Sequence, residues 1–309
     1  MARNLRDIRR KMKAIRSTRQ VTKAMELVAA SKMRRAVTNA QKLRHYAFTA
    51  WHILQKLASV QPELHPYLQE REPRKILALV FTPDRGLCGS LNAQLLRTTT
   101  QYLKGLKDIA TFEKVDFVAV GRKGQQFLPR LKQDIIAAFP GFSGYPTFKD
   151  VLPITRLATE SFLQGTYDHV VLLYPDFISP IVQEATVKVL LPFSKTGLKE
   201  MILSLLPRRY RRETEEALSK ADVHEYLFEP DQDEILKTIL PQLTEIQVYQ
   251  AVLETSASEH SARMVAMRNA SDNASDILDD LTLTYNQTRQ AGITAELAEL
   301  SATAAALSG

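Results

Sequence analysis

Residues 242–291 read QLTEIQVYQAVLETSASEHSARMVAMRNASDNASDILDDLTLTYNQTRQA, a stretch without proline or glycine. Within this stretch, residues spaced alternately three and four apart form a heptad-like series: Leu243, Ile246, Gln250, Leu253, Ala257, His260, Met264, Met267, Ser271, Ala274, Leu278, Leu281 and Tyr285. This spacing predicts one long helix with a seam for a partner helix, and the polar members of the seam help to fix its register. Continued to the last residues, the helix is about 100 Å long.

The first residues of the chain have the same character. No proline or glycine occurs between Met1 and Gln61. Apolar residues at helical spacing begin with Leu5, Ile8, Met12 and Ile15. Further along the helix we expect this apolar stripe to shift gradually around the helix surface, a drift that passes through Val21, Met25, Val28 and Met33. The sequence thus predicts a second helix of about 90 Å. It ends near residue 59, because Pro62 and Pro66 follow.

The two predicted helices carry opposite charge. Residues 1–44 hold 14 Lys and Arg and two acidic residues, residues 231–309 hold 12 acidic residues and four bases, and the 309-residue chain carries +7. Helices this long need a partner along their length, and opposite charge favours pairing one with the other. We therefore expect an antiparallel coiled coil of the two chain ends, since a compact middle segment can release both ends together. The alternative is a solvated basic helix and an independent acidic helix.

The middle of the chain alternates strands and helices. Apolar runs predict strands at residues 75–82, 115–120, 169–174 and 181–191. We expect helices at 90–107, 122–132 and 151–164, a loop rich in glycine and proline at 139–146, an insertion at 196–223 and a possible closing strand at 226–229. This order is typical of an α/β domain with a largely parallel sheet. The predicted organisation is therefore an N-terminal helix (1–61), an α/β domain (74–230) and a C-terminal helix (231–309).

The sequence offers little for catalysis. Residues 84–92 (DRGLCGSLN) place two glycines between a strand and a helix, where α/β proteins bind phosphates. They match neither nucleotide-binding glycine motif, so we interpret them as a tight turn in which Cys88 is a small buried residue. A single cysteine excludes an intramolecular disulfide, and the six histidines lack metal-ligand spacing. We expect no catalytic, cofactor-binding or metal-binding residues, and no stretch is long and apolar enough to span a bilayer.

The basic first helix raises nucleic-acid binding as an alternative. A zipper-type DNA-binding helix has its leucine seam after the basic region, whereas here the apolar stripe runs through it. A cationic face against acidic protein loops, or near anionic lipid, fits at least as well. Residues 1–20 are rich in arginine like a mitochondrial transit peptide, but the helical pattern continues through residue 50, so we expect mature structure.

Four stretches resemble the gamma subunit of F-type ATP synthases. They are VTKAMELVAASKMRRA (21–36), GLCGSLN (86–92), YLFEPD (226–231) and SEHSARMVAMRNASDNASDILDDLTLTYNQTRQAGIT (258–294). The resemblance implies a non-catalytic central-stalk rotor, an antiparallel coiled coil inside a ring of alternating alpha and beta subunits. Its Rossmann-like domain would form a foot that sits, with the epsilon subunit, on the membrane c-ring. It also implies torque transmission that couples proton flow to ATP synthesis, on the cytoplasmic face of a bacterial membrane, without cofactor, nucleic acid or small-molecule substrate.

The resemblance also implies subunit contacts. Arg289, Gln290 and Thr294 match family residues that contact the catalytic subunits near the upper shaft. Met25 matches the position that faces an acidic loop of the beta subunit, and the nearby cationic candidates are Lys23, Lys32, Arg34 and Arg35. The alternative for each is ordinary packing or a solvated face. The last residues, SATAAALSG, are expected to form a tip in a hydrophobic bearing, and the insertion lacks the cysteine pair of the plant type, so thiol switching is not expected.

Overall fold

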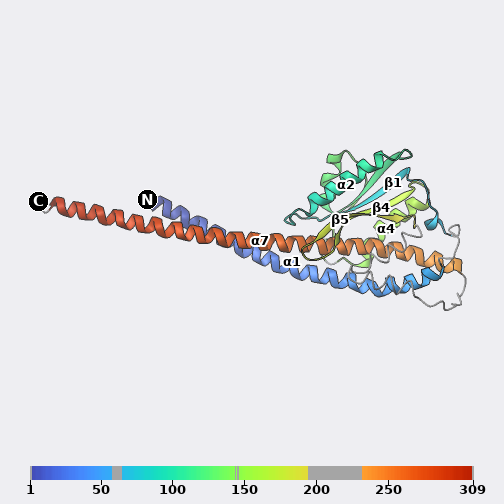
Figure 1. Ribbon diagram of the computed structural model, residues 1–309, viewed down its shortest axis with the longest axis horizontal. Coiled ribbons are helices and arrows are strands. Elements are labelled where there is room, and N and C mark those ends of the chain that lie inside the picture. Colours follow the sequence, from blue (N-terminus) through green and yellow to red (C-terminus); the bar gives the residue numbers. More distant parts are fainter. Residues whose placement is uncertain (1, 58–64, 143, 145, 194–231, 308–309) are drawn as a thin grey trace. The chain divides into compact units, whose positions relative to one another are not determined.

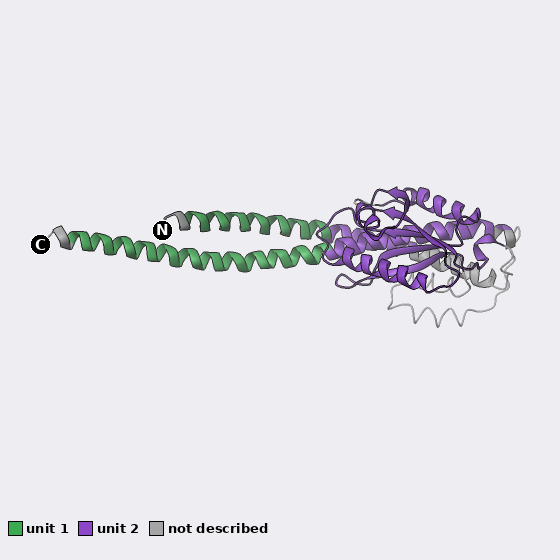
Figure 2. Cartoon of the chain, turned by 90° about the horizontal axis from the view of Figure 1, so that it is seen from above, with its two compact units in different colours: residues 1–29, 263–309 green, residues 30–262 purple. Residues whose placement is uncertain are grey.

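The computed structural model describes residues 2–57, 65–142, 144, 146–193 and 232–307. The predicted insertion and the possible strand at 226–229 lie outside the described residues. The longest elements are α1 (Ala2–Leu57) and α7 (Gln232–Leu307). The chain divides into two compact units, a paired-helix unit (residues 1–29 and 263–309) and a sheet unit (residues 30–262), coloured green and purple in Figure 2.

The sheet unit is built on five strands in the order β3-β2-β1-β4-β5. Their bounds are β1 Lys75–Phe81, β2 Lys114–Val120, β3 Ile135–Phe139, β4 His169–Phe177 and β5 Gln183–Leu191. The first four pair in parallel, and β5 pairs antiparallel with β4 as a hairpin. After their first residue, β1 and β2 are buried throughout. Continuous apolar runs of this kind are expected of strands covered on both faces.

Helices cover both faces of this sheet (Figure 1). One face packs against α2 (Leu91–Lys107) and α3 (Arg122–Phe127), through Leu95, Leu106 and Phe127. The other packs against α4 (Phe148–Leu163) and the first half of α7, through Val151, Ile154 and Leu240. The short helices η2 (Pro66–Leu68) and η3 (Pro129–Leu131) complete the unit. The predicted fold class, α/β with a largely parallel sheet and long terminal helices, is confirmed.

Two local predictions differ from the structure. The sequence predicts a single helix at 122–132, but α3 ends at Phe127 and η3 follows at Pro129, which has no N–H to continue an α-helix. The sequence predicts no strand at 135–139, where β3 forms the edge of the sheet. A five-residue run between polar residues is too short for its period to distinguish a strand from a loop.

Helix α7 begins before Pro241 and continues through it. Proline inside a helix removes one backbone hydrogen bond and normally kinks or ends the helix. Here Leu236, Leu240 and Leu243 on both sides of the proline are buried in the sheet unit. Their burial at helical spacing offsets the lost bond, so the helix starts nine residues before Pro241.

The paired-helix unit contains the beginning of α1 and the end of α7, which run antiparallel (Figure 2). Arg9 Nη2 donates a hydrogen bond of 2.6 Å to the Tyr285 hydroxyl, and its guanidinium lies 5.5 Å from the centre of the tyrosine ring. Half-buried residues of α1 line the seam: Leu5, Ile8, Met12 and Ile15. From α7 the seam buries Met267, Ser271, Ala274 and Leu278, as the heptad spacing predicts.

The predicted drift of the α1 stripe is wrong at Val21 and Val28, whereas Met25 and Met33 are half-buried. Val21 and Val28 are 55% and 57% exposed, whereas Thr22 and Ala29 are 8% and 2% exposed. Ile15, Thr22 and Ala29 are seven residues apart, so the strict heptad register continues with small side chains. Small residues let two helix backbones approach closely, and this leaves the valines on the outer surface.

Candidate functional site

The outer surface of α1 in the paired-helix unit carries an apolar strip. Val21, Met25 and Val28 share one helix face because they are four and three residues apart. Both valines are exposed and Met25 is half-buried. Next to them, Lys23 Nζ lies 2.9 Å from Glu26 Oε2, in a pair whose lysine is exposed and whose glutamate is half-buried. We call Val21, Met25 and Val28 the outer strip.

The remaining cationic candidates lie one to three turns further along α1, in the sheet unit. Lys32 is half-buried, and Arg34 and Arg35 are exposed. Lys32 follows Met25 by seven residues and therefore lies on the same side of the helix. Arg34 follows Met25 by nine residues and therefore lies on the opposite side of the helix.

The second predicted group lies near the end of α7, in the paired-helix unit. Arg289, Gln290 and Thr294 are all exposed, whereas the seam continues through the half-buried Tyr285, Thr288, Gly292 and Ala295. The three predicted residues therefore point away from the pairing surface. Their position leaves them available to another chain.

Threonine hydroxyls along this part of α7 bond to their own helix. Thr294 Oγ1 donates to the Gln290 carbonyl at 3.0 Å, and Thr288 Oγ1 donates to the Thr284 carbonyl at 2.8 Å. Thr282, Thr284 and Thr303 make the same bond to the carbonyl four residues earlier. These hydroxyl protons are therefore satisfied within α7.

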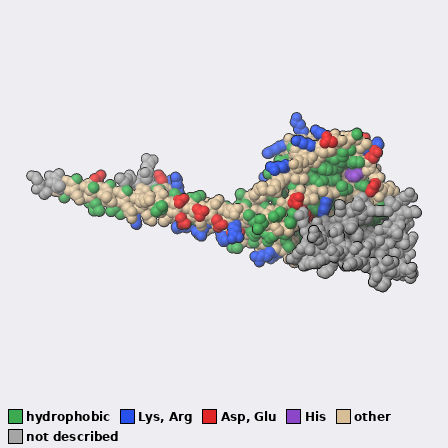
Figure 3. All heavy atoms as spheres, viewed as in Figure 1, with side chains coloured by type: hydrophobic (Ala, Val, Ile, Leu, Met, Phe, Trp, Pro, Cys, Tyr) green, Lys and Arg blue, Asp and Glu red, His purple; other side chains and the backbone are tan. Residues whose placement is uncertain are grey.

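The structure does not bring the two predicted groups together. The Arg9–Tyr285 contact sets the register of the antiparallel pair, so Met25 lies near the level of residue 269 on α7. Arg289 is twenty residues further along α7, which is about 30 Å at 1.5 Å per residue. The paired-helix unit thus presents two separate candidate contact patches. Acidic, basic and apolar side chains are interspersed along its surface in Figure 3.

The strand-to-helix turn at 84–92 is held by its own carboxylate. Asp84 Oδ1 accepts hydrogen bonds from the backbone N–H groups of Arg122 and Gly141, both at 3.0 Å. These bonds join the ends of β1, β2 and β3. An anion placed there would meet the Asp84 carboxylate, which favours a structural turn over a phosphate site. Cys88 is 1% exposed, as predicted for a small buried residue.

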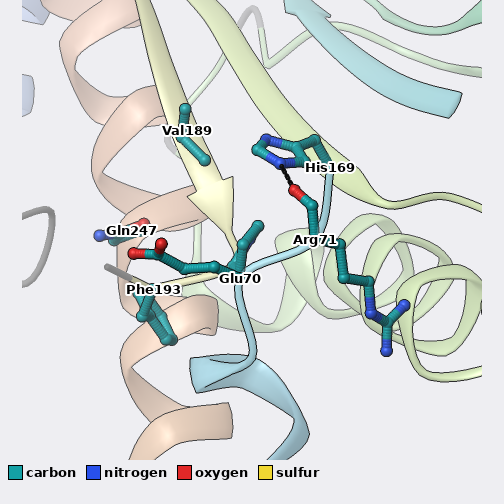
Figure 4. A pocket seen from close by; sticks show the side chains of 7 residues that line it. Glu70, Arg71, His169, Val189, Phe193 and Gln247 are labelled. Carbon is teal, nitrogen blue, oxygen red and sulfur yellow. Dashed lines mark hydrogen bonds between the residues drawn. The ribbon is translucent and has the colours of Figure 1, made fainter. Parts of the chain in front are cut away.

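A cavity of about 200 Å³ opens beside the lower end of β5 (Figure 4). Glu70, Arg71, His169, Val189, Pro192, Phe193 and Gln247 line it. His169 Nε2 lies 2.8 Å from the Arg71 carbonyl oxygen, and the Arg71 guanidinium turns away to donate to the Phe162 carbonyl and stack on the Phe162 ring. With both groups engaged, the lining presents no converging pair of reactive side chains, and we assign it no chemistry.

Sequence reasoning missed a buried polar contact between α7 and the β4–β5 hairpin. Ser258 Oγ donates to the Pro175 carbonyl at 3.0 Å, and Ser261 Oγ donates to the Pro180 carbonyl at 2.6 Å. Beside them, Gln250 Nε2 donates to Glu254 Oε1 at 2.6 Å. Of these residues only Gln250 stands in the predicted seam. The signal was the serine-rich run in the middle of a helix, which is unusual unless the serines meet another backbone.

Comparisons with known proteins agree with the resemblance. The family model described as ATP synthase matches residues 4–307. The ATP synthase gamma chain of Roseiflexus castenholzii is 41% identical over 305 residues, which cover 98% of each chain. The ATP synthase gamma chain of Cupriavidus pinatubonensis is 40% identical over 303 residues, which cover 98% of this chain and 99% of that one.

Solved structures show the same fold. A chain in the central stalk and c-ring structure of Tetrahymena thermophila mitochondrial ATP synthase matches with a TM-score of 0.55 and 26% identity, covering 81% of this chain and 99% of that one. A chain in the rotor of Euglena gracilis mitochondrial ATP synthase matches in fold with a TM-score of 0.58 and 19% identity, covering 95% and 100%. Because the family model spans nearly the whole chain and curated relatives are about 40% identical along it, this chain belongs to the family of ATP synthase gamma chains.

Proposed function

We propose that this chain is the central-stalk rotor subunit of an F-type ATP synthase. It transmits torque between the membrane c-ring and the catalytic ring of alpha and beta subunits, couples proton flow to ATP synthesis, and catalyses no reaction itself. The observation that carries this proposal is the paired-helix unit, in which a continuous seam is filled from both helices and the outer positions are exposed. The names of the relatives support it.

The physical properties of the helix pair suit this role. A shaft that transmits torque must resist twisting, and a heptad seam packed along its length provides that resistance. The same shaft must not bind any one angular position too tightly. Exposed charges such as Lys23 and Arg289 are screened by salt, so they form weak contacts that are readily exchanged.

Two patches are the proposed subunit contacts. Arg289, Gln290 and Thr294 contact the catalytic subunits, and their exposure away from the seam supports this. Met25 faces an acidic loop of the beta subunit, with Lys23, Lys32, Arg34 and Arg35 as the cations of that region. The exposed valines of the outer strip support an apolar contact at Met25. Leu297 and Leu300, also exposed, support a bearing at the end of α7.

Each of the three predicted segments has a proposed role. Residues 1–61 and 231–309 form the shaft, and residues 74–230 form the foot, which sits on the c-ring together with the epsilon subunit. The chain is then a peripheral protein on the cytoplasmic face of a bacterial cell membrane, and the bacterial relatives support this location. Among the described helices, none has a stretch apolar enough to cross a bilayer.

Purification from membranes tests this proposal. The chain, carrying an affinity tag in an exposed loop of the foot, is isolated from detergent-solubilised membranes of its own cells. We expect alpha, beta, epsilon and c subunits to accompany it in fixed proportions. We also expect a bead attached to the foot to rotate when ATP is added to an immobilised complex.

A matched assay covers the nucleic-acid alternative. Purified chain is mixed with DNA and RNA in a gel-shift experiment at two salt concentrations. Tight binding that weakens steeply with salt, together with recovery of the tagged chain without the catalytic subunits, would overturn the rotor proposal.

A further inference from the structure

Three half-buried ionisable side chains lie in the sheet unit, on the elements that meet where α7 packs against the β4–β5 hairpin. Glu254 comes from α7, Asp176 from the end of β4 and Lys188 from β5. Gln250 lies one turn before Glu254, and its Nε2 atom donates a hydrogen bond of 2.6 Å to Glu254 Oε1. Among the described residues, Oε2 of Glu254 has no hydrogen-bond partner although it is buried. We call Glu254, Asp176 and Lys188 the triad.

The elements around the triad fix its members in place. Lys188 stands opposite Leu172 in the hairpin register, and its Nζ lies 5.7 Å from the centre of the Tyr174 ring. Asp176 stands opposite Glu184, which is exposed. The Ser258 bond to Pro175 holds α7 against the strand one residue before Asp176. Glu254 is therefore enclosed by α7, β4 and β5, with Asp176 and Lys188 as the charged groups that act on it.

The charge of the triad is unbalanced unless a proton is bound. Two carboxylates and one ammonium carry a net charge of −1, and an uncompensated buried charge is strongly unfavourable. One proton on Glu254 makes the triad neutral and turns its unpaired Oε2 atom into a donor toward the Asp176 carboxylate. Burial, with the nearby charge of Asp176 adding to it and that of Lys188 opposing it, raises the pKa of Glu254 to about 8.

We propose that Glu254 keeps its proton at neutral pH, donates it in a hydrogen bond to the Asp176 carboxylate and thereby latches α7 to the β4–β5 hairpin. When the proton leaves, the two carboxylates repel each other and draw water, so the contact loosens. The stabilisation is complete below the ordinary carboxyl pKa of 4.5 and is lost as pH rises to the folded value near 8. Within this window the opening equilibrium changes by up to about tenfold per pH unit.

Hydrogen exchange on the isolated full-length chain tests the latch. Protection of residues 174–188 and 250–258 is compared with that of α2 in the same molecule between pH 6 and pH 9, which cancels the intrinsic pH dependence of exchange. We expect the protection of these two segments relative to α2 to fall by about tenfold or more in the wild-type chain. Glu254→Gln mimics the protonated carboxyl, so we expect it to keep the latch closed across this range.

Infrared spectroscopy reads the proton directly. The wild-type chain should show the carbonyl band of a protonated carboxylic acid at pH 7, and Glu254→Gln should lack it. The matched control is Glu234→Gln, an exposed glutamate on the same helix, which should retain both the band and the pH profile. The absence of this band from the wild-type spectrum, or equal loss of protection in Glu254→Gln and wild type, would overturn the proposal.

A second variant keeps the test decisive if Glu254→Gln does not fold. Asp176→Asn removes the carboxylate that repels ionised Glu254, so the relative protection of residues 174–188 and 250–258 should fall less between pH 6 and pH 9 than in the wild-type chain. A fall equal to that of the wild-type chain would contradict the latch. No partner subunit is needed in these measurements, so their outcome is independent of the rotor proposal.

Discussion

Gly121 joins the end of β2 to the start of α3 in a backbone conformation that other residues avoid. Its φ is +97°, and an added Cβ would overlap the carbonyl oxygen of Thr82. The Thr82 hydroxyl in turn accepts the Gly124 N–H at 2.8 Å. We expect Gly121→Ala to lower the free energy of unfolding by more than about 2 kcal/mol. Urea unfolding followed by circular dichroism measures the change.

The matched control for Gly121 is Gly105, which lies exposed in α2 with open space around its Cβ position. Gly105→Ala should raise stability by about 0.5–1 kcal/mol, because alanine loses less backbone entropy in a helix. If both alanine variants behave alike, the close approach of Gly121 to Thr82 is not a constraint on the sheet unit.

Arg9 and Tyr285 provide a test of the helix register. The hydrogen bond and the ring contact join residues 276 positions apart in the chain. A double-mutant cycle of Arg9→Met and Tyr285→Phe should give a coupling free energy of about 0.5–1 kcal/mol. The free energies of opening measured by hydrogen exchange in residues 2–15 and 281–292 give this coupling, and Gln287→Ala serves as a control at an exposed position. Additive effects of the two substitutions would mean that the pair is not formed in solution.

Individual contact residues were the least predictable part of the sequence. Arg289, Gln290 and Met25 were proposed because stretches of the chain resemble a family, and spacing alone did not single them out. The triad of Glu254, Asp176 and Lys188 was not predictable, since 78 residues separate Asp176 from Glu254. Only the folded hairpin and helix bring such groups together.

The elements themselves were largely readable, because their patterns are long. Every member of the heptad series on α7 from Leu243 to Leu278 is buried except the half-buried Met264, and the apolar runs predict β1, β2, β4 and β5. The series does not predict the further α7 residues, such as Val248 and Val252, that are buried in the sheet unit. Tertiary packing overrides local preference at two places, of which only β3 was missed by the prediction. Pro241 lies inside a helix because buried leucines flank it, and β3 forms because β2 offers an open edge.

The small residues in the α1 seam determine how closely the two helices approach. Ala29 is 2% exposed, whereas Ala24 on the same helix is exposed. We expect Ala29→Leu to destabilise the chain by about 1–3 kcal/mol, because a larger side chain forces the helices apart. Ala24→Leu should change stability by less than about 0.5 kcal/mol. Chemical denaturation of the two variants decides whether the heptad assignment or the predicted valine stripe is correct.

At the scale of the whole molecule, the outer strip governs the proposed coupling. Met25→Lys places an ammonium group among the exposed Val21, Val28 and Lys23. We expect the variant to fold and assemble but to pump fewer protons per ATP hydrolysed, because the added cation pairs too strongly with facing acids or is poorly solvated. Met25→Leu, which keeps the strip apolar, should remain near wild type. An unchanged pumping ratio for Met25→Lys in reconstituted vesicles would refute this role.

Arg289 tests the second patch. Loss of a charged contact of this kind costs about 1.5–3 kcal/mol, so Arg289→Ala should lower ATP turnover by roughly tenfold or more while assembly is less affected. Arg268, also exposed on α7 in the paired-helix unit, is the matched control. Turnover and subunit stoichiometry are measured on the same purified complex. Normal turnover of fully assembled Arg289→Ala complex would remove Arg289 from the contact.

The threonine hydroxyls of α7 affect how easily a neighbouring protein can move along the surface of this helix. Five of them, from Thr282 to Thr303, donate to carbonyls of their own helix. A neighbouring protein that moves past them meets few hydroxyl donors, so little hydrogen bonding must be broken and remade at each step. Internal satisfaction of these groups lowers the friction of the surface, and a helix can then change neighbours repeatedly without dissipating much energy as heat.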